Sequence, residues 1–151
     1  MRGFSLIELI TCIVILAMLA ALAGPRFVDT QSFNQRGYID ELAAALRYAE
    51  GVAVATGCSV QVTVNLAGYT AMQRAAAAGN TCAVAGAYVT PVVRADGSPL
   101  SGSPPSNANI AAGGTIVFGP SGAVANPPPP AFAVGSFTLT VDPASGFVAV
   151  Q

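Results

Sequence analysis

The residues of this sequence that are best suited to chemistry are its acidic side chains and its cysteines, because the chain contains no histidine. Histidine is the commonest general base and metal ligand in proteins. The acidic residues are scattered, without a paired-acid or nucleophile-elbow context, and the serines cluster in predicted loops without a base. We therefore expect no catalytic residue and no cofactor. The seven acidic residues are Glu8, Asp29, Asp40, Glu41, Glu50, Asp96 and Asp142.

Two of the three cysteines are placed where a disulfide would be useful. Cys58 follows a predicted helix and Cys82 follows a predicted hairpin, so a bridge between them would tie the hairpin to the helix for about 3 kcal/mol on the loop-entropy model. The alternative is a pair of buried thiols. Cys12 lies in an apolar run and should pack there. Three cysteines without histidine argue against zinc, and Asp96 offers only one carboxylate for calcium, so we expect no metal site.

Glu8 is the one ionisable residue in an apolar run that extends from Phe4 to Gly24. The run is long enough to cross a bilayer as a helix, which takes about 20 mostly apolar residues. A carboxylate there costs about 2.5–3.5 kcal/mol, so Glu8 should either reach interfacial water or pair with a positive charge from another chain. A secretory signal cleaved after Ala23, or an anchor that is retained uncleaved, are alternative explanations of the run.

The unbroken sequence Gly3-Phe4-Ser5-Leu6-Ile7-Glu8-Leu9-Ile10 resembles the prepilin leader of type IV pilins and type II secretion pseudopilins. The resemblance implies that prepilin peptidase cleaves after Gly3 and that the new N-terminus, Phe4, is methylated. It also implies that Glu8 pairs with the ammonium group of a neighbouring subunit and sets the axial register of a filament. Methylation keeps the positive charge of an amine, and an unpaired buried charge would be costly.

A long helix should follow the apolar run. Gly24-Pro25 predicts a kink or a short melted stretch before the helix continues, because proline removes a helix hydrogen bond and glycine eases bending. From Tyr38 to Ala55, apolar residues recur at three- and four-residue spacing, which predicts an amphipathic continuation of the helix over 25–57 that lies against a sheet. Gly57 is a natural end of this helix. The predicted buried face consists of Ile39, Leu42, Leu46, Ala49 and Ala53.

The remainder, 58–151, reads as strands and turns. Residues 59–65 alternate and place Val60, Val62 and Val64 on one face. Residues 69–74 should pair back as a hairpin, and 75–79 should form a small-residue loop. Pro91 confines the strand candidate 87–94 to an edge or to a bulge. A Pro-, Ser- and Gly-rich loop is expected over 96–114, followed by a short strand at 115–118. A last hairpin is predicted from 136–141 and 147–150.

These elements predict an α+β protein whose arrangement resembles the pilin fold. The resemblance implies a leader at 1–3, a membrane or filament-core helix at 4–24, its amphipathic continuation at 25–57 and a β-rich head, with a mostly antiparallel sheet, at 58–151. The helix at 36–56, the valine-alternating strand and the segment Ile116–Gly122 most resemble minor pseudopilins of the GspH/FimT type, including the MSHA-pilus minor pilin. The partners that this resemblance implies are prepilin peptidase, other pilin or pseudopilin subunits, the inner-membrane assembly platform and the membrane itself, with the head in the periplasm.

Four functions follow from these features. The favoured one is a structural minor subunit that joins or initiates a type IV pilus or a type II secretion pseudopilus. A DNA-uptake pilin, a major pilin and a secreted or anchored β-rich domain are the alternatives. Two features argue against binding to nucleic acid. The chain has six basic and seven acidic residues and so no excess of positive charge, and its C-terminal end, 146–151, contains no lysine or arginine.

Overall fold

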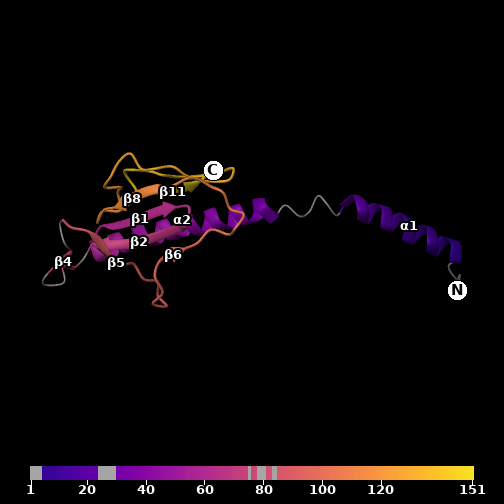
Figure 1. Ribbon diagram of the computed structural model, residues 1–151, viewed down its shortest axis with the longest axis horizontal. Coiled ribbons are helices and arrows are strands. Elements are labelled where there is room, and N and C mark those ends of the chain that lie inside the picture. Colours follow the sequence, from indigo (N-terminus) through magenta and orange to yellow (C-terminus); the bar gives the residue numbers. More distant parts are fainter. Residues whose placement is uncertain (1–4, 24–29, 75, 78–80, 83–84) are drawn as a thin grey trace. The chain divides into compact units, whose positions relative to one another are not determined.

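A computed structural model describes residues 5–23, 30–74, 76–77, 81–82 and 85–151 of the chain. The chain divides into two compact units, Met1–Thr30 and Gln31–Gln151. In the first unit the described element is helix α1 (Leu6–Ala23). The second, called the globular unit below, holds nearly all of helix α2 (Thr30–Thr56) and every described strand (Figure 1). The predicted α+β class is thus confirmed.

Helix α2 has one buried face, as its periodicity predicted. Ile39, Leu42, Leu46, Ala49 and Ala53 are all completely buried. On the outer side, Arg36 and Asp40 form an i,i+4 ion pair with 3.0 Å between Nε and Oδ2, an exposed contact worth a few tenths of a kcal/mol. The helix ends at Thr56, and Gly57 directly after it has a φ of 67°, the left-handed conformation that favours glycine after a helix.

The larger sheet is antiparallel and is built around β1 (Val60–Asn65). Strand β1 pairs with β2 (Gly68–Arg74) through a tight turn, and on its other side with β8 (Gly114–Phe118). The outer side of β2 carries β5 (Tyr88–Pro91) near one end and β6 (Ser101–Gly102) near the other. Pro91 therefore lies in an edge strand, as expected, because proline cannot donate to a central ladder.

A second antiparallel sheet has the order β11-β10-β9-β7. Its strands are β7 (Ile110–Ala112), β9 (Phe132–Val134), β10 (Phe137–Val141) and β11 (Val148–Val150). Strands β10 and β11 are the predicted last hairpin. The turn between β9 and β10 contains Gly135 at φ 58°, where an added Cβ would overlap the side chain of Gln35 on α2. The β-structure is thus divided between two main sheets.

One hydrophobic core joins α2 to both sheets. Val60, Val62 and Val64 of β1 point into it, and Phe118, Phe132 and Leu139 contribute from the other strands. Each large apolar side chain that is fully buried contributes about 1.5–3 kcal/mol before conformational entropy is subtracted. The two sheets and α2 therefore form a single cooperative body within the globular unit.

Two segments differ from the sequence-based expectation. The 96–114 segment was predicted as loop, yet it contains β6 and β7, because Leu100 and Ile110 are buried and hold it against the core. The 75–79 segment was also predicted as loop, but β3 (Ala76–Ala77) pairs with β4 (Thr81–Cys82). Cys82 is joined to Cys58 by a disulfide with 5.3 Å between the Cα atoms, which attaches this small hairpin to the end of α2.

The free edge of β8 is closed by the side chain of Asn126. Asn126 Nδ2 donates to Thr115 O at 3.0 Å, and Asn126 Oδ1 accepts from Val117 N at 2.7 Å. The neighbouring Ala125 N donates to Val117 O at 2.7 Å. A side-chain amide carries the donor and the acceptor of a peptide group, so Asn126 takes the place that another strand would occupy.

Candidate assembly site

Helix α1 exposes apolar side chains on all its sides. Residues 5–20 are all exposed, and the fractions include 76% for Leu6 and 64% for Leu16. A helix that is apolar all round is stable in solution only when something covers it. Within the described part of the chain, no helix combines the length and the apolar character needed to cross a membrane.

Glu8 lies in the first turn of α1. Its backbone N–H donates to Ser5 O at 3.0 Å, and Leu9 N donates to the same oxygen at 3.2 Å, so Ser5 begins the helix. A carboxylate three residues after the start lies near the positive end of the helix dipole, which stabilises it by about 0.3–1 kcal/mol. The structure therefore places Glu8 in a position that suits a negative charge, and its role between subunits stays a prediction.

Four residues that the sequence singled out lie outside the described residues. They are Gly3 and Phe4, predicted for cleavage and methylation, and Gly24 and Pro25, predicted for a helix kink. The cleavage, the methylation and the kink accordingly stay predictions.

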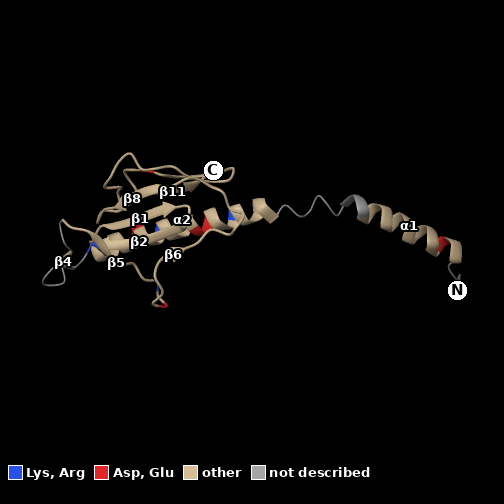
Figure 2. Ribbon diagram, viewed as in Figure 1, with Lys and Arg blue, Asp and Glu red and all other residues tan. Residues whose placement is uncertain are grey.

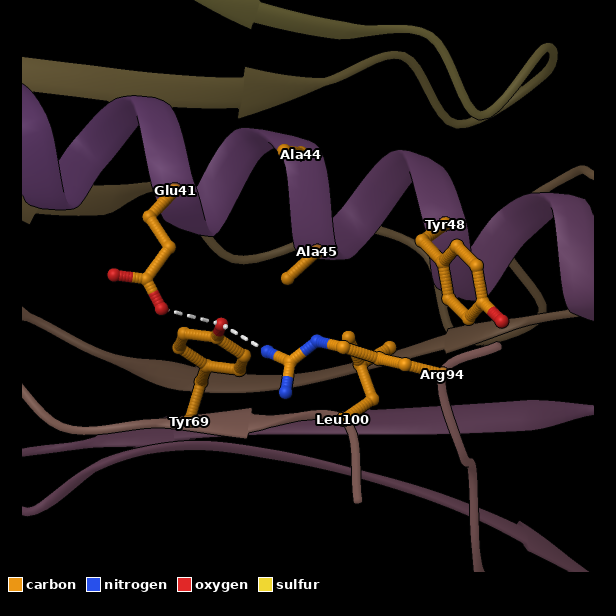
Figure 3. A pocket seen from close by; sticks show the side chains of 7 residues that line it. All are labelled: Glu41, Ala44, Ala45, Tyr48, Tyr69, Arg94 and Leu100. Carbon is orange, nitrogen blue, oxygen red and sulfur yellow. Dashed lines mark hydrogen bonds between the residues drawn. The ribbon is translucent and has the colours of Figure 1, made fainter. Parts of the chain in front are cut away.

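A polar network that the sequence did not reveal connects α2 with β2 and the segment after β5 (Figure 3). Tyr69 donates its hydroxyl hydrogen to Glu41 Oε1 at 2.7 Å, and Arg94 Nη2 donates to the Tyr69 hydroxyl at 3.3 Å. Arg94 also donates to Pro99 O at 2.9 Å and to Ser101 O at 3.1 Å. Glu41, Tyr69 and Arg94 line a pocket of about 300 Å³, whose other walls are Ala44, Ala45, Tyr48 and Leu100.

Burial determines the protonation of the two tyrosines beside Glu41. Burial, followed by the hydrogen bond to Glu41, raises the pKa of Tyr69 from 10.0 to about 12, while Arg94 acts in the opposite direction. Burial and the negative charge of Glu41 raise the pKa of Tyr38 to about 12 as well. The Tyr38 hydroxyl has no hydrogen-bond partner among the residues described. Tyr69 therefore remains a hydrogen-bond donor to Glu41 throughout the physiological range.

The two aspartates that were considered as turn residues do form turns. Asp96 Oδ1 accepts from Ser98 N at 2.9 Å and from Ser98 Oγ at 2.6 Å, and these bonds lower the pKa of Asp96. Asp142 Oδ1 accepts from Ala144 N and Ser145 N, both at 2.8 Å, and the bonds to Ser145 are the main cause of its lowered pKa. Across the described ranges, no group of three or more acidic or cysteine side chains is arranged to hold a metal ion.

Charged residues are sparse on both units (Figure 2). The arginines of the globular unit hold elements of the fold: the guanidinium of Arg36 lies over the ring of Phe137 at 5.3 Å, and that of Arg74 lies over Tyr88 at 5.0 Å. Arg47 Nη2 donates to Val148 O at 3.0 Å on the strand β11. The arrangement offers hydrogen-bonded anchors between elements and an uncovered apolar helix, which suits assembly with other chains better than chemistry.

Comparisons with known proteins agree with this reading. Residues 1–24 match the model of the prokaryotic N-terminal methylation motif, and residues 39–151 match that of the type II transport protein GspH. The chain is 46% identical over 52 residues to the type IV narrow pilus major component PilA5 of Thermus thermophilus. These 52 residues make up 34% of this chain and 45% of that protein. The chain thus aligns with less than half of this relative. No solved structure matches. The chain belongs to the GspH family of type IV pilin and type II secretion pseudopilin proteins.

Proposed function

We propose that this protein is a structural minor subunit that joins or initiates a type IV pilus or a type II secretion pseudopilus. The observation that carries the proposal is α1, an apolar helix whose residues up to 20 are all exposed and whose sequence matches the N-terminal methylation motif. In this proposal α1 makes the contacts with other subunits, and the globular unit is the folded domain that α1 anchors to them.

The processing steps follow from the same motif. We propose that prepilin peptidase removes residues 1–3 after Gly3 and that Phe4 becomes the methylated N-terminus. The run 4–24 then holds the subunit in the inner membrane, with the globular unit in the periplasm, until the assembly platform transfers it into a filament. There the Phe4 ammonium of one subunit pairs with Glu8 of its neighbour, which removes the cost of a buried unpaired carboxylate.

The chain is either a minor or a major subunit of its filament, and the two differ in copy number. The match to GspH over 39–151 supports a minor subunit, as this is the type that the globular sequence resembles. A major subunit is the second candidate, because the relative from Thermus thermophilus is a major pilus component. Quantifying the chain against the other subunits of sheared, purified filaments separates the two.

Intact-mass and N-terminal analysis tests the proposal. Protein is purified from cells with and without prepilin peptidase. The expected product begins at methylated Phe4 and disappears when the peptidase is absent. A product that begins after Ala23, or an uncleaved chain in both strains, would refute the assignment and leave a secreted or anchored β-rich domain.

A further inference from the structure

The pocket beside the Tyr69 hydroxyl has two long side chains of α2 at its ends and two small ones between them. Glu41 and Tyr48 are seven residues apart, or about 10.5 Å along the helix axis. Ala44 and Ala45 lie between them and leave a hollow of about 300 Å³. Figure 3 shows the Arg94 guanidinium in the interval between Glu41 and Tyr48. Ligand pockets range from about 300 to 1,000 Å³, so this one suits a single side chain better than a nucleotide or a cofactor.

The walls of the pocket are fixed before anything enters it. Arg94 donates hydrogen bonds to the Tyr69 hydroxyl and to two backbone carbonyl oxygens. The ring of Tyr48 is 40% exposed, yet its hydroxyl donates to Val93 O at 3.0 Å, which holds the ring at the end of the pocket. Leu100, which is 3% exposed, forms the wall opposite the helix. A site that is already ordered loses little conformational entropy when a ligand binds.

Two polar groups of the pocket have capacity left for a ligand. A carboxylate can accept about four hydrogen bonds, and the described residues donate one to Glu41, from the Tyr69 hydroxyl. The hydrogen bonds of Arg94 lie in the plane of its guanidinium, so the face of this cation remains available, and such a face attracts an aromatic ring. The pocket therefore offers a hydrogen-bond acceptor at one end and a cationic face beside it.

The charges of the pocket favour a neutral ligand. Glu41 and Arg94 are joined through the Tyr69 hydroxyl, so their opposite charges lie within two hydrogen bonds of each other. A cation drawn to Glu41 would be repelled by Arg94, and an anion drawn to Arg94 would be repelled by Glu41. A neutral planar ring with an N–H on its edge satisfies both groups. Tryptophan combines such an N–H with the aromatic ring that cations bind best.

Two other sources of planar rings fit this pocket less well. A nucleobase would bring phosphate groups, yet among the described residues that line the pocket Arg94 alone is basic, and basic residues are sparse on the globular unit (Figure 2). A second copy of the chain cannot supply a tryptophan, because the sequence contains none. The occupant is therefore expected from a different protein.

We propose that this pocket binds a tryptophan side chain of another protein, with the indole N–H donating to Glu41 and the ring covering the Arg94 guanidinium. Tyr48 and Leu100 then enclose the apolar edges of the ring, as expected for an aromatic anchor at the centre of an interface. The inference goes beyond the proposed function, because it gives the globular unit a partner other than copies of the chain. It needs neither cleavage after Gly3 nor a filament.

Binding of a short peptide tests the pocket. An uncharged pentapeptide with tryptophan at its centre is added to the full-length chain in phosphatidylcholine vesicles, and protein-free vesicles give the background. Because the chain has no tryptophan, the fluorescence of the peptide is followed alone. The peptide should bind saturably. A peptide with 1-methyltryptophan, whose ring nitrogen carries no hydrogen, should bind about tenfold more weakly, through the loss of one hydrogen bond to a charged acceptor.

Glu41→Gln tests the same hydrogen bond from the side of the protein. Glutamine keeps one oxygen for the Tyr69 hydroxyl and replaces the other by a donor, so affinity for the tryptophan peptide should fall about tenfold. The 1-methyltryptophan peptide should lose nothing further, because both changes remove one bond. Glu50→Gln is the matched control: it makes the same change on the same helix outside this pocket, and should bind like the wild type. Near-ultraviolet circular dichroism of the tyrosines reports that each variant is folded.

Photo-cross-linking in cells identifies the occupant. The photoreactive residue p-benzoylphenylalanine replaces Val93, which is 52% exposed and adjoins Arg94 at the rim of the pocket. The cross-linked product is digested and sequenced by mass spectrometry. The attachment should lie in a different protein, within a few residues of a tryptophan, and its yield should fall when Glu41→Gln is added but not when Glu50→Gln is added.

Several results would overturn the inference. They are no saturable binding of the tryptophan peptide, equal affinity for the 1-methyltryptophan peptide, and equal effects of Glu41→Gln and Glu50→Gln. Displacement of the peptide by a single-stranded oligonucleotide, or cross-links to nucleic acid or to a second copy of the chain, would show a different occupant and would also overturn it. None of these results bears on processing after Gly3, so the proposed function is decided by its own test.

Discussion

Replacing Tyr69 by phenylalanine should destabilise the globular unit through the loss of one hydrogen bond. Tyr69 is 1% exposed, and its hydroxyl lies 2.7 Å from Glu41 Oε1. A hydrogen bond to a charged acceptor contributes about 1.5–3 kcal/mol. Because Glu41 is exposed, the lower end applies. Arg94 loses one weak contact at 3.3 Å but keeps its bonds to two carbonyl oxygens, so we expect a loss of about 1.5–2 kcal/mol.

A double-mutant cycle isolates this bond. Thermal unfolding of the full-length chain in detergent is followed by the tyrosine signal in near-ultraviolet circular dichroism, since the chain has no tryptophan. Tyr69→Phe should lower the Tm by about 5–7 °C, and its coupling with Glu41→Ala should reach at least about 1 kcal/mol. Tyr88→Phe is the control, because the Tyr88 hydroxyl makes no hydrogen bond with the residues that the structure describes. A coupling below about 0.3 kcal/mol, or equal effects of Tyr69→Phe and Tyr88→Phe, would show that the network does not stabilise α2 against β2.

Three further outcomes are expected. The pKa values of Tyr38 and Tyr69 are both raised to about 12, so the folded state holds these two protons more tightly than the unfolded state does. Their contribution to the free energy of unfolding is complete below pH 10 and is lost as the pH rises to 12. Tyr69→Phe should make that loss smaller, as measured by unfolding at alkaline pH. Glu8→Ala should leave the globular unit folded and reduce the chain recovered in sheared filaments; recovery at the wild-type level would remove the role of Glu8 in register. Replacing both Cys58 and Cys82, which are 24 residues apart, by serine should cost about 3 kcal/mol of unfolding free energy, measured in urea, and a cost below about 1 kcal/mol would contradict the loop-entropy argument.

The elements with a regular apolar period were predictable from the sequence. The face of α2 and the alternation Val60-x-Val62-x-Val64 each follow from one segment read alone, and the buried residues are those that the period selects. The short strands β6 and β7 could not be predicted from the sequence, because Leu100 and Ile110 are isolated apolar residues in a segment rich in proline, serine and glycine. Such residues become strands only when a partner strand is already placed beside them.

The network around Tyr69 could not be predicted for a different reason. Glu41, Tyr69 and Arg94 come from a helix, a central strand and a turn, and no spacing in the sequence relates them. Their meeting depends on the register of β2 and on the 94–98 turn that Asp96 stabilises. The N-terminal site is the opposite case, because its residues are contiguous and form a motif that is read locally.

The side chain of Asn126 on the edge of β8 has a consequence for how copies of this protein can join. An open strand edge recruits other chains into sheets that grow without a defined end and rarely come apart. Asn126 ends the larger sheet on one side, and Pro91 lies in the strand at the other. Crowded copies are thereby discouraged from fusing through their sheets, and association is left to helices, whose side-chain contacts can form and separate again.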